Sequence, residues 1–109
     1  DKAILYYQKA VDQGHPGAMN NLGVCYKEGD GVAVDLEKSF ALFLQAAKLD
    51  NENAYLNLAR AYTYGQGTEV SIKDAKYWCQ KALDVQVEGA KELMKVIKRK
   101  SFVHPFKGS

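Results

Sequence analysis

Histidine, cysteine and acidic side chains are the groups of this 109-residue chain that could carry out acid–base, nucleophilic or metal chemistry. His15 stands beside Pro16 and His104 lies near the carboxyl end. Neither has a carboxylate, cysteine or serine at the spacing of a general base, a triad or a metal site. The two cysteines, Cys25 and Cys79, also lack the spacing of metal ligands. We therefore expect no enzymatic activity, no catalytic residue, no metal and no cofactor.

Two other patterns resemble ligand sites but fit a structural role better. Gly29-Asp30-Gly31 resembles a phosphate-binding loop, yet it follows a predicted helix and has no Lys-Ser or Lys-Thr behind it, which favours a turn between helices. Several aromatic residues suggest a base-stacking platform, but their spacing is that of a helical core. These residues are Tyr26, Phe40, Phe43, Tyr62 and Trp78.

A 36-residue repeat positions all of these side chains. Ala18, Ala54 and Ala90 are spaced 36 apart, and residues 18–53 share nine identities with residues 54–89 without a gap. A fixed period of this size is typical of a solenoid, whose units cannot bury a core alone. Small residues seven apart also predict close helix packing in each unit. They are Ala3/Ala10, Ser39/Ala46 and Ala75/Ala82.

The pattern within a unit predicts two helices. Ala18, Leu22 and Tyr26 lie at i, i+4 and i+8 and form the apolar stripe of a first helix. Two glycines then suit a turn, and Asp35 offers an N-cap for a second helix. The chain is therefore predicted to be all-α, with no sheet. The predicted helices are residues 1–13, 17–28, 35–48, 52–64, 71–84 and 88–100.

We expect one helical-repeat domain over residues 1–100, followed by a tail. The predicted parts are a partial repeat at 1–13, repeats at 18–53 and 54–89, a terminal helix at 90–100 and a non-helical tail at 101–109. Phe102 and Phe106 are expected to pack back onto the last helices. Because the first residues already lie within a helical pattern, we also expect the chain to be part of a longer protein.

Residues 18–48 carry the pattern Ala-x3-Leu-Gly-x2-Tyr-x2-Gly-x-Gly-Val, followed by Asp35 and by Ala46-Ala47 near the end of the second helix. This pattern resembles the Sel1-like repeat, a relative of the tetratricopeptide repeat, whose own period is about 34 residues. The second copy keeps the register and departs from the pattern at Ala59, Thr68 and Ser71. The resemblance implies a right-handed superhelix of antiparallel helix pairs. It also implies an adaptor or scaffold that organises protein complexes, with no reaction attached.

In this superfamily the first helix of each unit lines the concave side of the stack. Side chains opposite Leu22/Tyr26 and Leu58/Tyr62 are then expected to face a groove that binds a segment of a protein partner. The predicted partner-binding residues are Asn20, Asn21, Val24, Lys27, Leu56, Asn57, Arg60, Thr63, Glu92, Val96 and Arg99.

The asparagines leave two interpretations open. Asn21 and Asn57 are identical across the units, and a partly buried amide needs hydrogen-bond partners. They either bind the backbone of a peptide or brace the neighbouring repeats. The alternative function is accordingly a structural or regulatory segment of a larger protein, with no groove ligand of its own.

Charge is unevenly distributed along the chain. The net charge is +2, but residues 91–109 hold six Lys/Arg against one Glu. A solvated terminal helix explains this basic end, and an acidic partner, a phosphate or a membrane surface is the other explanation. We expect a protein or peptide partner, no nucleic-acid partner and no membrane insertion. The oligomeric state is left open, and two free, packed cysteines favour a reducing, cytoplasmic location.

Overall fold

The computed structural model describes residues 1–103 and folds them into six α-helices with no strand. The helices are α1 (Lys2–Asp12), α2 (Pro16–Glu28), α3 (Leu36–Lys48), α4 (Glu52–Tyr64), α5 (Ile72–Asp84) and α6 (Ala90–Val103). The all-α prediction is confirmed. One boundary was wrong: α6 continues through Val103, so the predicted non-helical tail begins too early. The contacts predicted for the side chains of Phe102 and Phe106 lie outside the described residues.

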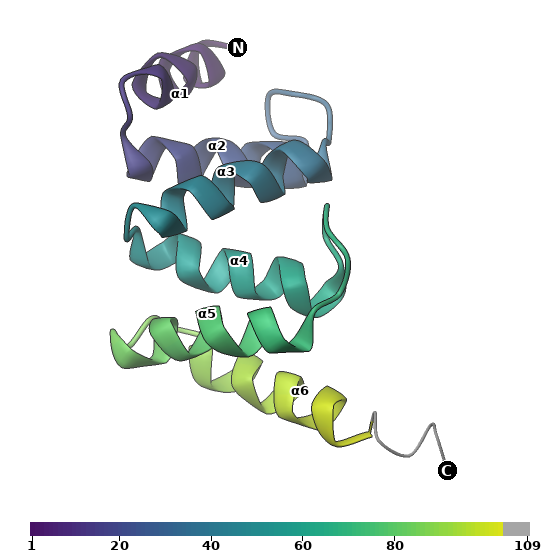
Figure 1. The fold of residues 1–109 in the computed structure, drawn as a ribbon. Helices are drawn as coiled ribbons and strands as arrows, with labels where there is room; N and C mark the ends of the chain where they lie inside the picture. The colour runs from purple at the N-terminus through teal and green to yellow at the C-terminus, as the bar shows by residue number, and fades with distance from the viewer. Residues whose placement is uncertain (104–109) are drawn as a thin grey trace.

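The helices form an elongated stack in which each one packs on the next, as Figure 1 shows from α1 to α6. We call α2, α4 and α6 the A helices, and α1, α3 and α5 the B helices. The most extensive contacts join an A helix to the B helix that follows it, α2 to α3 and α4 to α5. The A helices α4 and α6 also touch each other directly. The stack therefore has two layers, one of A helices and one of B helices.

Helices end at left-handed glycines and begin at N-cap side chains where the sequence predicts. Gly29 and Gly65 close α2 and α4 with φ of 72° and 71°, a conformation that costs glycine little. Asp35 caps α3 by accepting from the backbone N–H of Lys38 at 3.0 Å. Ser71 caps α5 by accepting from the N–H of Asp74 at 3.2 Å.

The loop between A and B helices also links one unit to the next. A Cβ atom on Gly67 would overlap the backbone carbonyl of Leu36 at the start of α3. In the preceding unit, a Cβ atom on Gly31 would come within 2.7 Å of the Asp1 carboxylate beside α1. Each loop therefore rests against the amino end of the preceding B helix, and glycine is needed for this close approach.

Packing between α2 and α3 is closest at Gly23. Ser39 donates from its hydroxyl to the Gly23 carbonyl at 2.7 Å, and a Cβ atom on Gly23 would lie 2.7 Å from the Phe43 ring. In the second unit, Ala59 takes the place of Gly23 and Cys79 takes the place of Phe43. A larger residue on the A helix is thus matched by a smaller one on the B helix, which keeps the interior close-packed.

The predicted core residues are largely confirmed. Phe43 is fully buried, and the other four aromatic residues named above are partly buried and pack against the core. Ser39, Ala46, Ala75 and Ala82 are buried, as close helix packing requires. Ala3 is exposed and Ala10 only partly buried, because α1 is packed on one side alone, against α2.

Gly23→Ala is expected to lower the free energy of unfolding by about 1–3 kcal/mol, since the new methyl group must displace the Phe43 ring. Gly17→Ala is the matched control on the same helix. Nothing lies within 4 Å of a Cβ atom on Gly17, so this change is expected to raise stability by about 0.4–1 kcal/mol. Urea unfolding followed by circular dichroism measures both. Equal effects would contradict the close packing at Gly23.

Candidate partner-binding face

A hydrogen bond between two asparagines joins the first two A helices. Asn57 on α4 donates from Nδ2 to Oδ1 of Asn20 on α2 at 2.9 Å. Asn20 is 7% exposed and Asn57 is partly buried. This bond crosses from one unit to the next, so Asn57 does brace the repeats. Asn21, the residue equivalent to Asn57 in the first unit, is exposed instead and lines an open cavity of about 310 Å³ between α1 and α2.

Helices α4 and α6 are also in contact, and the corresponding positions there are apolar. The residues equivalent to Asn20 and Asn57 are Leu56 on α4 and Leu93 on α6, each 5% exposed. The same position in the repeat therefore carries an amide pair in one seam and a leucine pair in the other. We refer to these contacts as the amide seam and the leucine seam.

Apart from Glu52 at its first position and the partly buried Tyr62, the central A helix, α4, is buried except along one strip. Its exposed or partly exposed residues at i, i+4, i+7 and i+11 are Asn53, Asn57, Arg60 and Tyr64. The strip lies opposite Leu58 and Tyr62, which face the B layer. Equivalent positions in the neighbouring units are Gly17, Asn21, Val24 and Glu28 on α2, Gly89 just before α6, and Val96, Lys100 and the buried Leu93 on α6. We call these three strips together the A face.

The structure brings five of the predicted partner-binding residues together on the A face. They are Asn21, Val24, Asn57, Arg60 and Val96. Lys27 is partly buried at the edge of this surface. The guanidinium of Arg60 lies close to the amino end of α6, since a Cβ atom on Gly89 would be 3.2 Å from its Nη2 atom.

Three predicted residues are buried, and their predicted place in a groove is corrected. Thr63 is fully buried and donates from its hydroxyl to the Ala59 carbonyl at 2.7 Å. Leu56 forms the leucine seam and Asn20 the amide seam. Asn20 is directed to Asn57 on the following A helix, and Leu56 lies beside Gly89 at the start of α6. Thr63 is seven residues after Leu56 and so lies on the same side of α4. The prediction from a single helix pair did not take the following A helix into account.

Glu92 and Arg99 on α6 occupy the positions equivalent to Leu56 and Thr63. Both are exposed, because no further A helix lies beside α6 among residues 1–103. They therefore lie at the edge of α6 rather than on the A face. Among the A-face positions with an exposed side chain, sequence reasoning missed four, and the i, i+4, i+7, i+11 spacing opposite the core stripe could have found them. These are Glu28, Asn53, Tyr64 and Lys100.

Tyr64 and Lys100 link the strips of α4 and α6. The ammonium group of Lys100 lies 5.6 Å from the centre of the Tyr64 ring, within cation–π range. Tyr64 is nevertheless 48% exposed, so one side of its ring remains open to a ligand. The A face thus offers amide, guanidinium, ammonium and phenol groups beside small apolar patches.

The described residues contain no cluster of three or more His, Cys, Asp or Glu side chains that could hold a metal ion. Cys25 and Cys79 are both buried and unbridged. Burial raises the pKa of each thiol. The carboxylates of Asp30 and Glu28 raise the pKa of Cys25 further, while the Arg60 guanidinium opposes the effect of burial on the pKa of Cys79. At neutral pH both thiols are therefore poor nucleophiles.

Over the part of the chain with described positions, the helices are too short or too polar to cross a membrane. The sequence matches the profile of the family described as Sel1 repeat in three segments, residues 1–15, 16–51 and 53–84. The chain belongs to the Sel1 repeat family. Sel1 repeats generally act as protein-interaction modules, so the family supports the interaction role in its general form.

Solved structures agree with this assignment. The chain is similar to a Sel1 repeat protein from Oxalobacter formigenes, with 33% identity, a TM-score of 0.82, and coverage of 87% of this chain and 28% of that one. It is similar to c5321, a protective antigen of uropathogenic Escherichia coli with an SLR fold, at 36% identity and a TM-score of 0.73. That match covers 74% of this chain and 17% of c5321. Cysteine-rich protein B of Helicobacter pylori matches at 26% identity and TM-score 0.76, covering 83% and 68%.

A curated relative is the chitin synthase regulatory factor 3 of Schizosaccharomyces pombe. It is 32% identical over 82 residues, which make up 74% of this chain and 9% of the relative. The chain thus spans less than a tenth of that protein.

Asn57→Ala is expected to lower the free energy of unfolding by about 1–3 kcal/mol, because it leaves the buried carbonyl oxygen of Asn20 without its donor. Asn20→Leu/Asn57→Leu copies the leucine seam, and replacing both partners by apolar groups is expected to recover most of that loss. Denaturant titrations of the two variants measure the difference. A double variant less stable than Asn57→Ala would show that the two seams are not equivalent.

The thiols give a second check. In unfolded, unreduced protein, both cysteines are expected to react with iodoacetamide. In the folded protein at neutral pH, alkylation of Cys79 is expected to be the slower of the two, since Cys79 is fully buried and Cys25 is 8% exposed. Peptide mass mapping follows each site. A mass two units below the reduced value, or equal protection of both, would contradict the described packing.

Proposed function

We propose that the A face binds an extended segment of a partner protein, and that the chain acts as an adaptor. The observation that carries the proposal is the open strip of α4. This helix is buried on every other side, and its exposed groups are two amides, a guanidinium and a phenol ring. Such groups bind peptide backbones, carboxylates and side-chain faces.

The amide seam can serve both support and binding. Its hydrogen bond uses a donor of Asn57 and leaves the Asn57 carbonyl oxygen able to accept from a peptide N–H. The bond also fixes the orientation of the Asn57 side chain, which lowers the entropy cost of binding. Bracing and ligand binding, which the sequence leaves as alternatives, are therefore compatible at this residue.

The other contacts of the proposed site follow from the flanking strips. Arg60 is placed to pair with a carboxylate of the segment, and Tyr64 to stack on a side chain. Val24 and Val96, equivalent to Arg60 in their units, supply apolar contact on either side. The similar yeast protein is named a regulatory factor, which fits a role in binding rather than catalysis for this chain.

Peptides selected from a random display library against the protein provide the test. The selected peptides are expected to shift backbone NMR signals of residues 53–64 more than those of the B helices. Arg60→Glu and Tyr64→Ala are each expected to weaken binding about tenfold or more at unchanged melting temperature, by repulsion of a carboxylate and by loss of a stacking surface.

Lys9→Glu and Tyr77→Ala are the matched controls, since Lys9 is exposed on α1 and Tyr77 is exposed on α5, a B helix, and neither is an A-face residue. Both are expected to leave affinity within about twofold. Failure to select any peptide, or selected peptides whose signals map away from residues 53–64, would favour a spacer segment with no groove ligand.

A further inference from the structure

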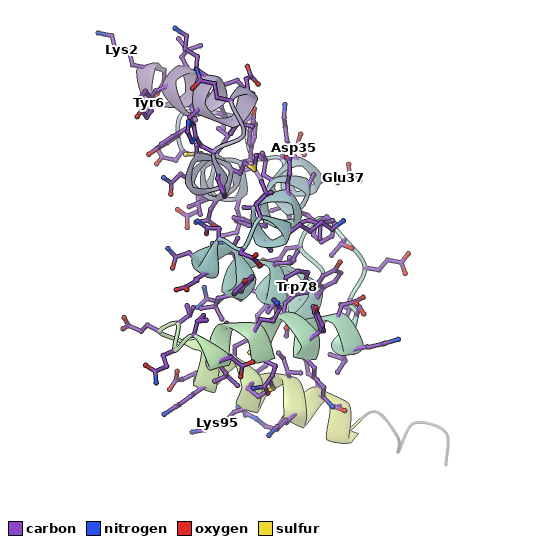
Figure 2. The ribbon with its side chains drawn as sticks, turned by 60° about the vertical axis from the view of Figure 1, so that its left-hand side comes forward. Lys2, Tyr6, Asp35, Glu37, Trp78 and Lys95 are labelled. Carbon is purple, nitrogen blue, oxygen red and sulfur yellow. The ribbon has the colours of Figure 1, made fainter. Side chains whose placement is uncertain are left out.

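A second surface lies on the B-helix side of the stack, between α5 and α6. An open groove of about 700 Å³ is formed there, away from the A face. Lys73, Lys76, Tyr77 and Lys81 line it from α5, and Met94 and Lys98 line it from α6. In the side view of Figure 2, Lys95 extends beyond the last helix on the outer side of α6, whereas Trp78 lies within the stack.

The repeat indicates which kind of element fits this groove. In the first unit, α3 lies against the Leu22/Tyr26 side of α2, where the Phe43 ring meets Gly23 and the Lys38 ammonium lies 5.0 Å from the centre of the Tyr26 ring. By the repeat, the Leu58/Tyr62 side of α4 corresponds to it in the second unit, where α4 packs on α5. The equivalent residues on α6 are Met94 and Lys98, and both line the groove. The groove is therefore the place in the stack that a helix occupies on α2 and on α4.

Lys95 changes how close such a helix can come. At the equivalent position, Gly23 lies in contact with the Phe43 ring, and Ala59 takes this place in the second unit. A lysine at this point holds a seated helix farther from α6 than α3 lies from α2. Contact must then come from long side chains at the rim and from the apolar floor, not from close backbone packing.

Charge and exposure define the rest of the site. Four lysines line the groove, and Asp84 is the acidic side chain among its lining residues. Tyr77 is 59% exposed, yet its ring is supported edge-on by Trp78 at 5.1 Å. The ammonium of Lys81 lies 5.8 Å from the centre of the Tyr77 ring. An exposed aromatic side chain that is supported by a second ring and has a cation beside it is typical of an interface anchor.

We propose that the groove between α5 and α6 binds an acidic amphipathic helix of a partner protein. The apolar face of that helix packs on Tyr77 and Met94, and its acidic flanks pair with Lys73, Lys81 and Lys98. Lys76 already donates to the hydroxyl of Ser101 at 3.2 Å and holds the two walls together. This proposal is independent of the A face, so either surface can fail its test without the other.

Trp78 is the single tryptophan of the chain and contacts Tyr77, so its fluorescence reports on the groove. The probe is a tryptophan-free synthetic peptide of about four helical turns, with leucine at i, i+3, i+4 and i+7 and glutamate on both flanks. Saturable binding to the protein is expected, with a change in Trp78 emission. A scrambled peptide of the same composition is expected to bind at least about tenfold more weakly.

Lys73→Glu/Lys98→Glu is expected to weaken binding of the acidic peptide by tenfold or more, about 1.4 kcal/mol per factor of ten. Lys73 lies in the first turn of α5, where a carboxylate is favourable, so the variant is expected to fold. Lys2→Glu/Lys9→Glu on α1 makes the same charge change and is expected to leave affinity within about twofold. Arg60→Glu on the A face is expected to keep peptide binding.

Three outcomes would overturn the proposal. Equal binding of the scrambled peptide would show attraction by charge alone. Equal weakening by the α1 variant would show that net charge, not the groove, sets the affinity. Tighter and steeply salt-dependent binding of single-stranded DNA that competes with the peptide would assign the lysines to a nucleic-acid site.

Discussion

The structure depends on the distance between the A and B helices within each unit. At Gly23 and Phe43 that distance is set by a residue with no side chain facing an aromatic ring, and the equivalent residues in the second unit are Ala59 and Cys79. Because the B helix covers one side of the A helix so closely, the opposite side is left exposed to solvent. The A face is therefore a consequence of how the core is packed rather than a separate feature of the surface.

Much of this arrangement could be predicted from the sequence, because the repeat imposes it more than once. The 36-residue period, the glycines that end α2 and α4 and the caps at Asp35 and Ser71 are local signals, and all six helices follow from them. The end of α6 was harder to place, since no glycine stands in the last unit where Gly29 and Gly65 stop the equivalent helices. Without that stop signal, the helix continues to Val103.

The site was predicted less well, for a physical reason. An apolar stripe identifies the side of a helix that faces its own pair, but it does not say which residues face the next unit. Thr63 and Leu56 were expected on the surface because only one neighbour was considered. Helix α4 contacts α2 through the amide seam as well as α3, α5 and α6, and Leu56 lies beside Gly89 at the start of α6. The amide seam was half-predicted. Asn57 was expected either to bind a peptide or to brace the repeats, whereas Asn20, its hydrogen-bond partner, was predicted only as a groove residue.

The two seams determine which copies of the unit can stand next to each other. A tandem duplication of the first unit would set Asn20 against a second Asn21, and two amides can pair there. Duplicating the second unit would instead set Leu56 against a second Asn57, burying an amide without a partner at a cost of about 1–3 kcal/mol. Duplication of the first unit therefore keeps a paired amide between A helices, whereas duplication of the second unit lowers the stability of the solenoid. The residues at the positions of Asn20 and Asn57 thus determine which unit can follow which.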